Sequence, residues 1–209
     1  GTKPAVVMIH GFASSLNAWD TVVGAIESTH RVIRLDLKGF GWSGRPAGDY
    51  SPRAQAEIVF ALMDQLGVES APIVAHSWGA SVALQMALMQ PGRVERLALY
   101  DAWVYSEQLP TFFVWSRAPV LGEMLFSMFY TERPDEKMEA AFFDSTILDQ
   151  AFVEHVEDML HRPGTSAAAL AAVRGQRYED VEKLYATIEQ PVLLLWGRED
   201  RVTTLEMGE

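Results

Sequence analysis

Residues 72–80, PIVAHSWGA, place a serine where a predicted strand meets a predicted helix. The apolar run 72–75 is typical of a buried strand, and a helical pattern starts at Trp78. A serine on so tight a turn is lifted above the sheet, provided that the residues two before and two after it are small. Ala75 and Gly79 meet this requirement. The pattern predicts that Ser77 is a nucleophile, whereas a serine that only caps the helix is the alternative.

Further strand and helix patterns alternate on both sides of this turn. Because the strands are continuously apolar and alternate with helices, we expect an α/β fold whose mostly parallel sheet is covered by helices on both faces. Ser51 and Pro52 form a typical helix start. The expected strands are 5–9, 31–35, 72–75, 94–100 and 191–196, and the expected helices are about 17–28, 52–66 and 78–90.

Residues 103–187 show helical segments broken by prolines and no strand pattern, which predicts a helical cap inserted into a core of residues 1–102 and 188–209. This segment contains 13 of the 22 aromatic residues. These aromatics are expected to form the small core of the cap, or alternatively to line an apolar substrate pocket. The candidates for the pocket are His10, Trp103, Phe112, Phe113 and Phe126.

The sequence His10-Gly11-Phe12 follows the first predicted strand. Ligands gather at the carboxyl ends of parallel strands, so this loop and the serine turn are expected to face the same crevice. The backbone N–H groups of Phe12 and Trp78 are then the expected donors of an oxyanion hole. We expect His10 to support the loop through hydrogen bonds rather than to act as a base.

Composition excludes several classes of function. The net charge of −11 disfavours nucleic acid, and the absence of cysteine excludes disulfides, thiolate metal sites and a cysteine nucleophile. Residues 39–44, GFGWSG, fit the dinucleotide-binding pattern, but the prolines and glycine that follow prevent a helix from starting there. The five histidines lack metal-ligand spacing, and His155 and His161 are expected on a solvated face of the cap. We therefore expect no cofactor and no metal.

The chain lacks the uninterrupted apolar run that a membrane span requires, and its first residues show no pattern of a signal peptide. We therefore expect a cytoplasmic protein without a membrane span. The alternative is a trimmed N-terminus, because the chain begins at Gly1. The sequence does not indicate an oligomeric state.

Four motifs in order resemble the α/β-hydrolase superfamily, in its lidded serine esterase, lactonase and haloperoxidase-like branch. They are HGF at 10–12, DLKGFGWSG at 36–44, AHSWGA at 75–80 and LLLWGREDRV at 193–202. The family often has glycine where Ala75 and Ala80 stand, and proline or arginine where Lys38 stands. The resemblance implies that Ser77 is the nucleophile, that Asp200 is the acid of the triad, and that the Phe12 and Trp78 amides form the oxyanion hole.

Asp101 also follows a predicted strand and is the alternative acid. The family's catalytic histidine follows the acid in the chain, and no histidine follows Asp200. The chain also opens directly on what resembles the family's third strand, so we expect a chain shortened at both ends. His76 is expected to point away from the crevice, because successive strand residues alternate.

The implied function is a serine hydrolase that cleaves a carboxylic ester, a lactone or a related acyl compound, with apolar acyl groups preferred over charged ones. The alternatives are a carbon–carbon bond hydrolase or a haloperoxidase-like enzyme with the same triad, and a non-catalytic binding protein of this fold. The expected partner is a small apolar acyl substrate.

Overall fold

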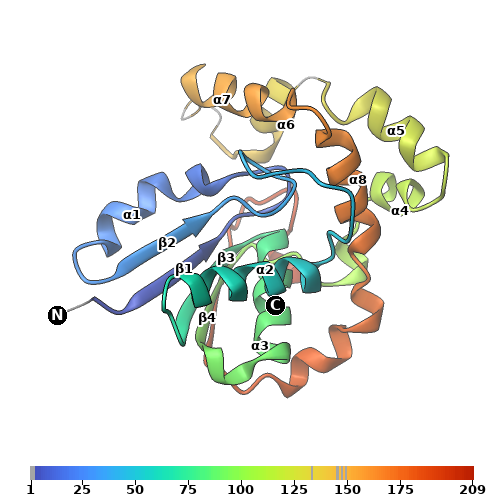
Figure 1. The fold of residues 1–209 in the computed structure, drawn as a ribbon. Helices are drawn as coiled ribbons and strands as arrows, with labels where there is room; N and C mark the ends of the chain where they lie inside the picture. The colour runs from blue at the N-terminus through green and yellow to red at the C-terminus, as the bar shows by residue number, and fades with distance from the viewer. Residues whose placement is uncertain (1–2, 133, 145, 147, 149) are drawn as a thin grey trace.

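The computed structural model describes residues 3–132, 134–144, 146, 148 and 150–209. Its five strands form one parallel sheet in the order β2-β1-β3-β4-β5 (Figure 1). The bounds agree with the predicted strands to within one residue. They are β1 Ala5–Ile9, β2 Arg31–Leu35, β3 Ala71–His76, β4 Val94–Tyr100 and β5 Val192–Leu195.

Three helices flank the sheet, as predicted. Helices α2, Pro52–Gln65, and α3, Trp78–Met89, pack together on one face, whereas α1, Asp20–Ile26, lies on the other (Figure 1). The Ser51 hydroxyl accepts a hydrogen bond from the Ala54 N–H, which confirms the predicted start of α2. Short 3-10 turns complete the core at η1 Leu16–Trp19, η2 Pro91–Arg93 and η7 Leu205–Met207.

The hydrophobic core lies where α3 covers the central strands. Residues 78–87 of α3 are all buried, because nearly every side chain of this helix is apolar or small. Strands β1 and β3 contribute the buried residues Val7, Ile9, Ile73 and Ala75. At β5 the prediction of a sheet covered on both faces is wrong: its four residues are exposed, because no described helix covers them. Strand β2, at the other edge of the sheet, is partly buried.

Between β4 and β5 the described residues form helices and 3-10 turns and no strand. The helices lie beyond the carboxyl ends of the strands (Figure 1). They are α4 Thr111–Ser116, α5 Leu121–Phe129, α6 Pro134–Ala141, α7 Gln150–Leu160 and α8 Thr165–Gly175, with the turns η3 Ser106–Gln108, η5 Tyr178–Asp180 and η6 Glu182–Thr187.

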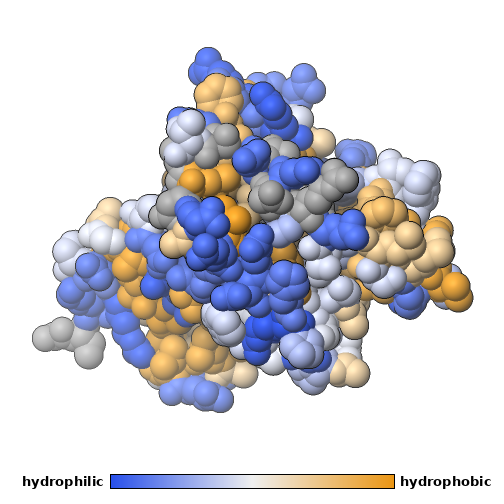
Figure 2. Space-filling model, turned by 90° about the horizontal axis from the view of Figure 1, so that it is seen from above, coloured by the Kyte–Doolittle hydropathy of each residue, from blue (hydrophilic) through white to orange (hydrophobic). Residues whose placement is uncertain are grey.

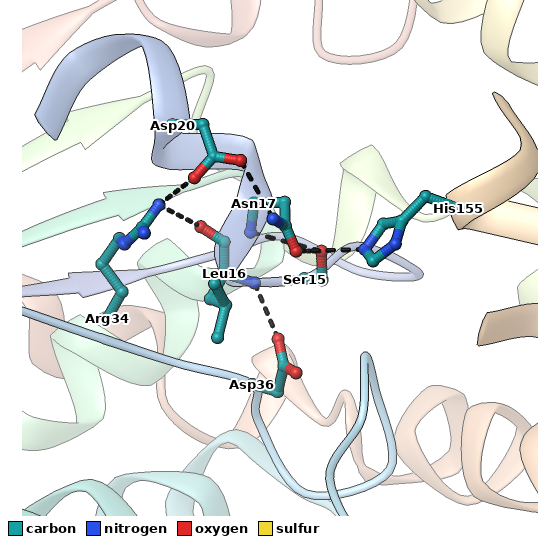
Figure 3. A network of polar contacts seen from close by, with 7 residues as sticks. All are labelled: Ser15, Leu16, Asn17, Asp20, Arg34, Asp36 and His155. Carbon is teal, nitrogen blue, oxygen red and sulfur yellow. Dashed lines mark hydrogen bonds and ion pairs between the residues drawn. The ribbon is translucent and has the colours of Figure 1, made fainter. Parts of the chain in front are cut away.

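Polar contacts join this helical segment to the loops of the core. His155 of α7 donates a hydrogen bond from Nε2 to Asn17 Oδ1 over 3.1 Å, and Asn17 in turn donates to Asp20 (Figure 3). The prediction of a solvated helical face is therefore wrong for His155, because its helix packs down on the core. Arg45, in the loop after β2, and Arg162, just after α7, each donate a hydrogen bond to the Gly41 carbonyl.

The loop after β2 carries the glycine-rich pattern 39–44. The next helix begins only at Pro52, which confirms that no helix starts inside the pattern. Asp36 instead organises this loop, because its carboxylate accepts hydrogen bonds from the Leu16 and Trp42 N–H groups at 2.7 and 2.8 Å.

Candidate active site

Ser77 lies at the junction of β3 and α3 in a conformation that a non-glycine residue rarely adopts. Its φ and ψ are +51° and −125°. Such a backbone costs on the order of 1–3 kcal/mol, so the surrounding structure must hold it. The Ser77 N–H donates to the Tyr100 carbonyl, and the Ser77 carbonyl accepts from Ala80 and Trp103. The Ser77 side chain makes no capping hydrogen bond to α3, so it is not the helix cap that the alternative interpretation required.

Two glycines allow the turn to approach the end of β1. A Cβ on Gly79 would lie 2.5 Å from the His10 carbonyl oxygen and 2.7 Å from that of Ile9. A Cβ on Gly11 would lie 3.0 Å from the Cβ of Ser77. The loop after β1 and the serine turn are therefore in contact, as the sequence predicted.

His10 is fully buried beneath this loop. Its Nε2 accepts a hydrogen bond from the Leu37 N–H at 3.0 Å, so the proton resides on Nδ1, which donates to the Gly11 carbonyl at 2.7 Å. Burial lowers the pKa of His10 to about 4, which keeps the ring neutral near pH 7. Both ring nitrogens thus bind backbone, and His10 supports the loop.

His76 lies in a different place from the one expected. Its Nδ1 lies beside Gly11, only 3.1 Å from the point that a Cβ on this glycine would occupy. Its ring interacts electrostatically with Asp101 and Asp200. Because Ser77 has a positive φ, the alternation of a regular strand ends there, and His76 does not point away from the site. Burial lowers the pKa of His76, and the two carboxylates oppose this shift.

The two candidate acids lie together at the ends of neighbouring strands. Asp101 follows β4 with a φ of +45°, and its Oδ1 accepts the Gly197 N–H at 2.7 Å. Asp200 Oδ1 accepts the Val202 and Thr203 N–H groups at 2.7 and 2.9 Å. Burial raises the pKa of Asp101, and the neighbouring Asp200 charge raises it further, whereas the Gly197 hydrogen bond lowers it.

Thr203 is a member of this site that the sequence interpretation did not include. It is buried, and its hydroxyl lies within hydrogen-bond distance of Asp200 Oδ2, at 3.0 Å, and of the Asp101 carbonyl, at 3.2 Å. The sequence Asp-x-x-Thr, in which the side chain of an aspartate can bind the backbone just beyond it, could have indicated this turn. The acids also border a cavity of about 190 Å³ that Phe142 and Phe143 line from the helical segment.

The structure brings four of the five predicted pocket residues together in one aromatic cluster. Phe113 stacks on Trp103 at 5.6 Å between ring centroids and contacts Phe12 at 5.1 Å. Phe112 and Phe126 pack together at 5.4 Å. Trp103 and Phe126 are buried in this packing, whereas Phe12, Phe112 and Phe113 retain exposed surface. The fifth residue, His10, lies below the loop.

Within the part of the chain that the structure describes, no group of three or more His, Cys, Asp or Glu side chains could hold a metal ion. Among the same residues, no helix is both long enough and apolar enough to cross a bilayer.

Comparison with known proteins identifies the family. A family model described as the alpha/beta hydrolase fold matches residues 4–209, and the chain belongs to this family. This result confirms the superfamily that the four sequence motifs indicated.

Individual relatives differ in their described activities. An uncharacterized protein of Mycobacterium tuberculosis is 31% identical over 97% of this chain, which spans 63% of the relative's length. The 2-hydroxymuconate semialdehyde hydrolase of a Pseudomonas strain is 28% identical over 96% of this chain and 72% of its own. The solved structure of epoxide hydrolase CorEH superposes with a TM-score of 0.81 at 22% identity, covering 94% of this chain and 76% of its own, and shows a common fold.

The buried, neutral His10 predicts a specific pH dependence of stability. Its pKa rises from about 4 in the folded chain to its ordinary value of 6.5 on unfolding. Below pH 6.5 the unfolded chain gains a proton that the folded chain does not, so the stability from this site falls with pH. Between pH 7.5 and pH 5 we expect a loss of about 2 kcal/mol from His10.

Urea unfolding at the two pH values tests this expectation. The His10→Asn variant should be less stable than the wild type at pH 7.5 but should lose about 2 kcal/mol less on acidification. The exposed His161 offers a matched control, His161→Asn, with the wild-type dependence. Equal pH slopes in the wild type and His10→Asn would contradict the assignment.

Proposed function

We propose that the protein is a serine hydrolase that forms an acyl-enzyme on Ser77. The observation that carries this proposal is the hydroxyl of Ser77, which sits on a strained turn and does not cap the helix that it precedes. A backbone strain held by three main-chain hydrogen bonds is typical of a functional position. The adjacent Gly11 leaves room beside the hydroxyl for a substrate carbonyl.

The backbone N–H groups of Phe12 and Trp78 are proposed as the oxyanion hole. Trp78 is the first residue of α3, where the helix dipole favours negative charge. Phe12 follows Gly11, whose position beside Ser77 brings this part of the loop to the nucleophile. Donors fixed in this way stabilise the oxyanion of a tetrahedral intermediate more than the ground-state carbonyl.

Asp200 is proposed as the acid that orients the catalytic base. Three hydrogen bonds, from Val202 N–H, Thr203 N–H and the Thr203 hydroxyl, hold its carboxylate in one orientation. Asp101 is the alternative, and its bond to Gly197 suits a residue that supports the turn on which Asp200 lies. No histidine of this chain follows Asp200, so the base is not assigned to a residue here.

In the proposed reaction, Ser77 Oγ attacks the acyl carbon while its proton passes to the base. The bond between the acyl carbon and the leaving oxygen then breaks, and the leaving oxygen takes that proton. Water hydrolyses the ester on Ser77 by the same sequence and restores the free hydroxyl. Neither step requires a cofactor or a metal ion.

Residues 103–187 are proposed to act as a cap that selects the substrate. Phe12, Phe112 and Phe113 offer partly exposed rings on the side of the cluster that meets the core. Burying a methylene on such a surface contributes about 0.8 kcal/mol, so apolar acyl groups should be preferred. Residues 103–209 carry 9 basic and 19 acidic side chains, an excess that disfavours anionic substrates.

Carbon–carbon bond hydrolysis is a second candidate, because the relative from Pseudomonas is named a 2-hydroxymuconate semialdehyde hydrolase. A non-catalytic binding protein of this fold would keep the pocket without a reactive serine. Covalent labelling of Ser77 distinguishes such a protein from a serine hydrolase.

The first test is the reactivity of Ser77. A fluorophosphonate probe, mapped by peptide mass spectrometry, should label Ser77, and Ser77→Ala should abolish the label. The same substitution should lower aryl-ester hydrolysis by the protein by more than about a thousandfold. Ser81→Ala is the matched control, because Ser81 lies on the same helix and donates to the Trp78 carbonyl. Label on another serine, with Ser77→Ala active, would overturn the proposal.

The second test separates the two acids. Asp200→Asn should lower kcat/KM by about 10³ to 10⁴-fold, because the base loses its orienting partner. Asp101→Asn should lower it by less than about tenfold, since an asparagine oxygen can still accept the Gly197 N–H. The reverse ranking of the two variants would assign the triad acid to Asp101.

The third test concerns the substrate class. Neutral aryl esters of increasing acyl length should show kcat/KM values that rise by about threefold or more per methylene until the pocket is filled. Succinylated esters of matched length should react more slowly. Faster turnover of the anionic esters, or of 2-hydroxymuconate semialdehyde over every ester, would show that the acyl-ester assignment is wrong.

A further inference from the structure

The outer surface of helices α4 and α5 is apolar although it faces solvent. We call it the α4–α5 surface, and it consists of the exposed residues Val114, Trp115, Val120, Leu121, Met124 and Met128. In Figure 2 hydrophobic side chains gather at the right edge of the molecule, where Figure 1 places these two helices. A contiguous exposed patch of this kind marks an interaction site.

Helix α5 is apolar on both sides, which distinguishes it from an ordinary surface helix. Phe126 and Gly122 are buried against the rest of the cap, whereas Met124 and Met128 on the other side are half exposed. Glu123 and Ser127 lie between these two apolar sides, and an apolar side of a helix is normally packed against another element. The outer side of α5 therefore lacks a cover within the described residues.

The turn that joins the two helices displays an apolar side chain at its tip. Val120 has a φ of +67° and is 80% exposed, and Trp115 nearby is 59% exposed. A β-branched residue is strained in this backbone conformation, and no burial of its side chain compensates for the strain. The turn thus exposes the Val120 side chain at the α4–α5 surface.

The charges of this segment identify the kind of partner. Residues 109–130 contain two charged side chains, Arg117 and Glu123. Arg117 pairs with Glu179 at 3.5 Å, and Glu123 pairs with Arg174 at 2.7 Å, so the segment carries no net charge. The chain as a whole carries −11, which opposes contact with a second copy or with an anionic surface.

We propose that the α4–α5 surface docks on an electrically neutral lipid surface, such as the face of a zwitterionic bilayer. Tryptophan, valine, leucine and methionine on one side of a helix pair bury their apolar groups at such an interface, and tryptophan is favoured there. The other side of the same helices carries Phe112, Phe113 and Phe126, which pack together, and Phe113 contacts Phe12 beside the serine turn. Docking therefore places the aromatic cluster next to the lipid.

Flotation of the 209-residue chain with phosphatidylcholine vesicles tests this proposal. The chain should float with the vesicles, and Val120→Ser/Met124→Ser/Met128→Ser should lower the partition coefficient by at least about tenfold. The matched control replaces exposed apolar residues elsewhere, as Ile58→Ser/Leu184→Ser/Val202→Ser, and should float as the wild type does.

A second measurement does not depend on the triple variant. Brominated phosphatidylcholine should quench part of the tryptophan fluorescence of the wild type, and Trp115→Phe should remove that part. The proposal is overturned if the wild type fails to float, if the control variant loses binding equally, or if the quenching is unchanged in Trp115→Phe. A dimer that dissociates in the Val120/Met124/Met128 variant, without vesicle binding, would assign the surface to self-association instead.

Discussion

The contact between helix α3 and the end of strand β1 is the constraint on which the site depends. Gly79 lies so close to the carbonyls of Ile9 and His10 that any side chain at this position would have to displace the backbone. This approach holds the first turn of α3 against the sheet, and Ser77, in its strained conformation, directly precedes that turn. The loop from His10 to Phe12 is held on the other side of the contact by the hydrogen bonds of His10. The serine turn and the loop from His10 to Phe12 are therefore positioned by the same close contact.

Much of the fold could be predicted from the sequence, because its strands and central helices have strong local patterns. The strand 5–9 and the cap of α2 at Ser51 are local features, and the structure confirms both. The turn at Ser77 could be located for the same reason, because small residues two before and two after a serine indicate a tight turn between a strand and a helix. The place of His76 could not, because the positive φ of Ser77 interrupts the alternation on which that expectation was based.

Residues whose roles depend on tertiary contacts were harder to predict. His155 has the sequence surroundings of a solvated helix, and only the packing of α7 on the core brings it to Asn17. Trp103 and Phe126 are buried by other aromatic rings, whereas Phe112 and Phe113 from the same segment keep exposed surface. Composition alone cannot tell which of these residues are buried and which keep exposed surface, because all four are aromatic. The exposure of β5 likewise depends on which elements pack on it, because β2, the other edge strand, is partly buried.

Arginines that bind main-chain carbonyls help to join the helical segment between β4 and β5 to the loops of the core. Arg45 donates to the carbonyls of Ser43, Gly41 and Met159, and Arg162 to those of Gly41 and Ser43. A carbonyl is the same group in every amino acid, so Ser43 and Met159 can be exchanged without losing these acceptors. Gly41 cannot, because it has a φ of +50° and a Cβ there would lie 2.2 Å from the carboxyl carbon of Asp36. The attachment of the helical segment therefore depends on two arginine side chains and one glycine, and the other residues at this joint can diverge during evolution without loosening it.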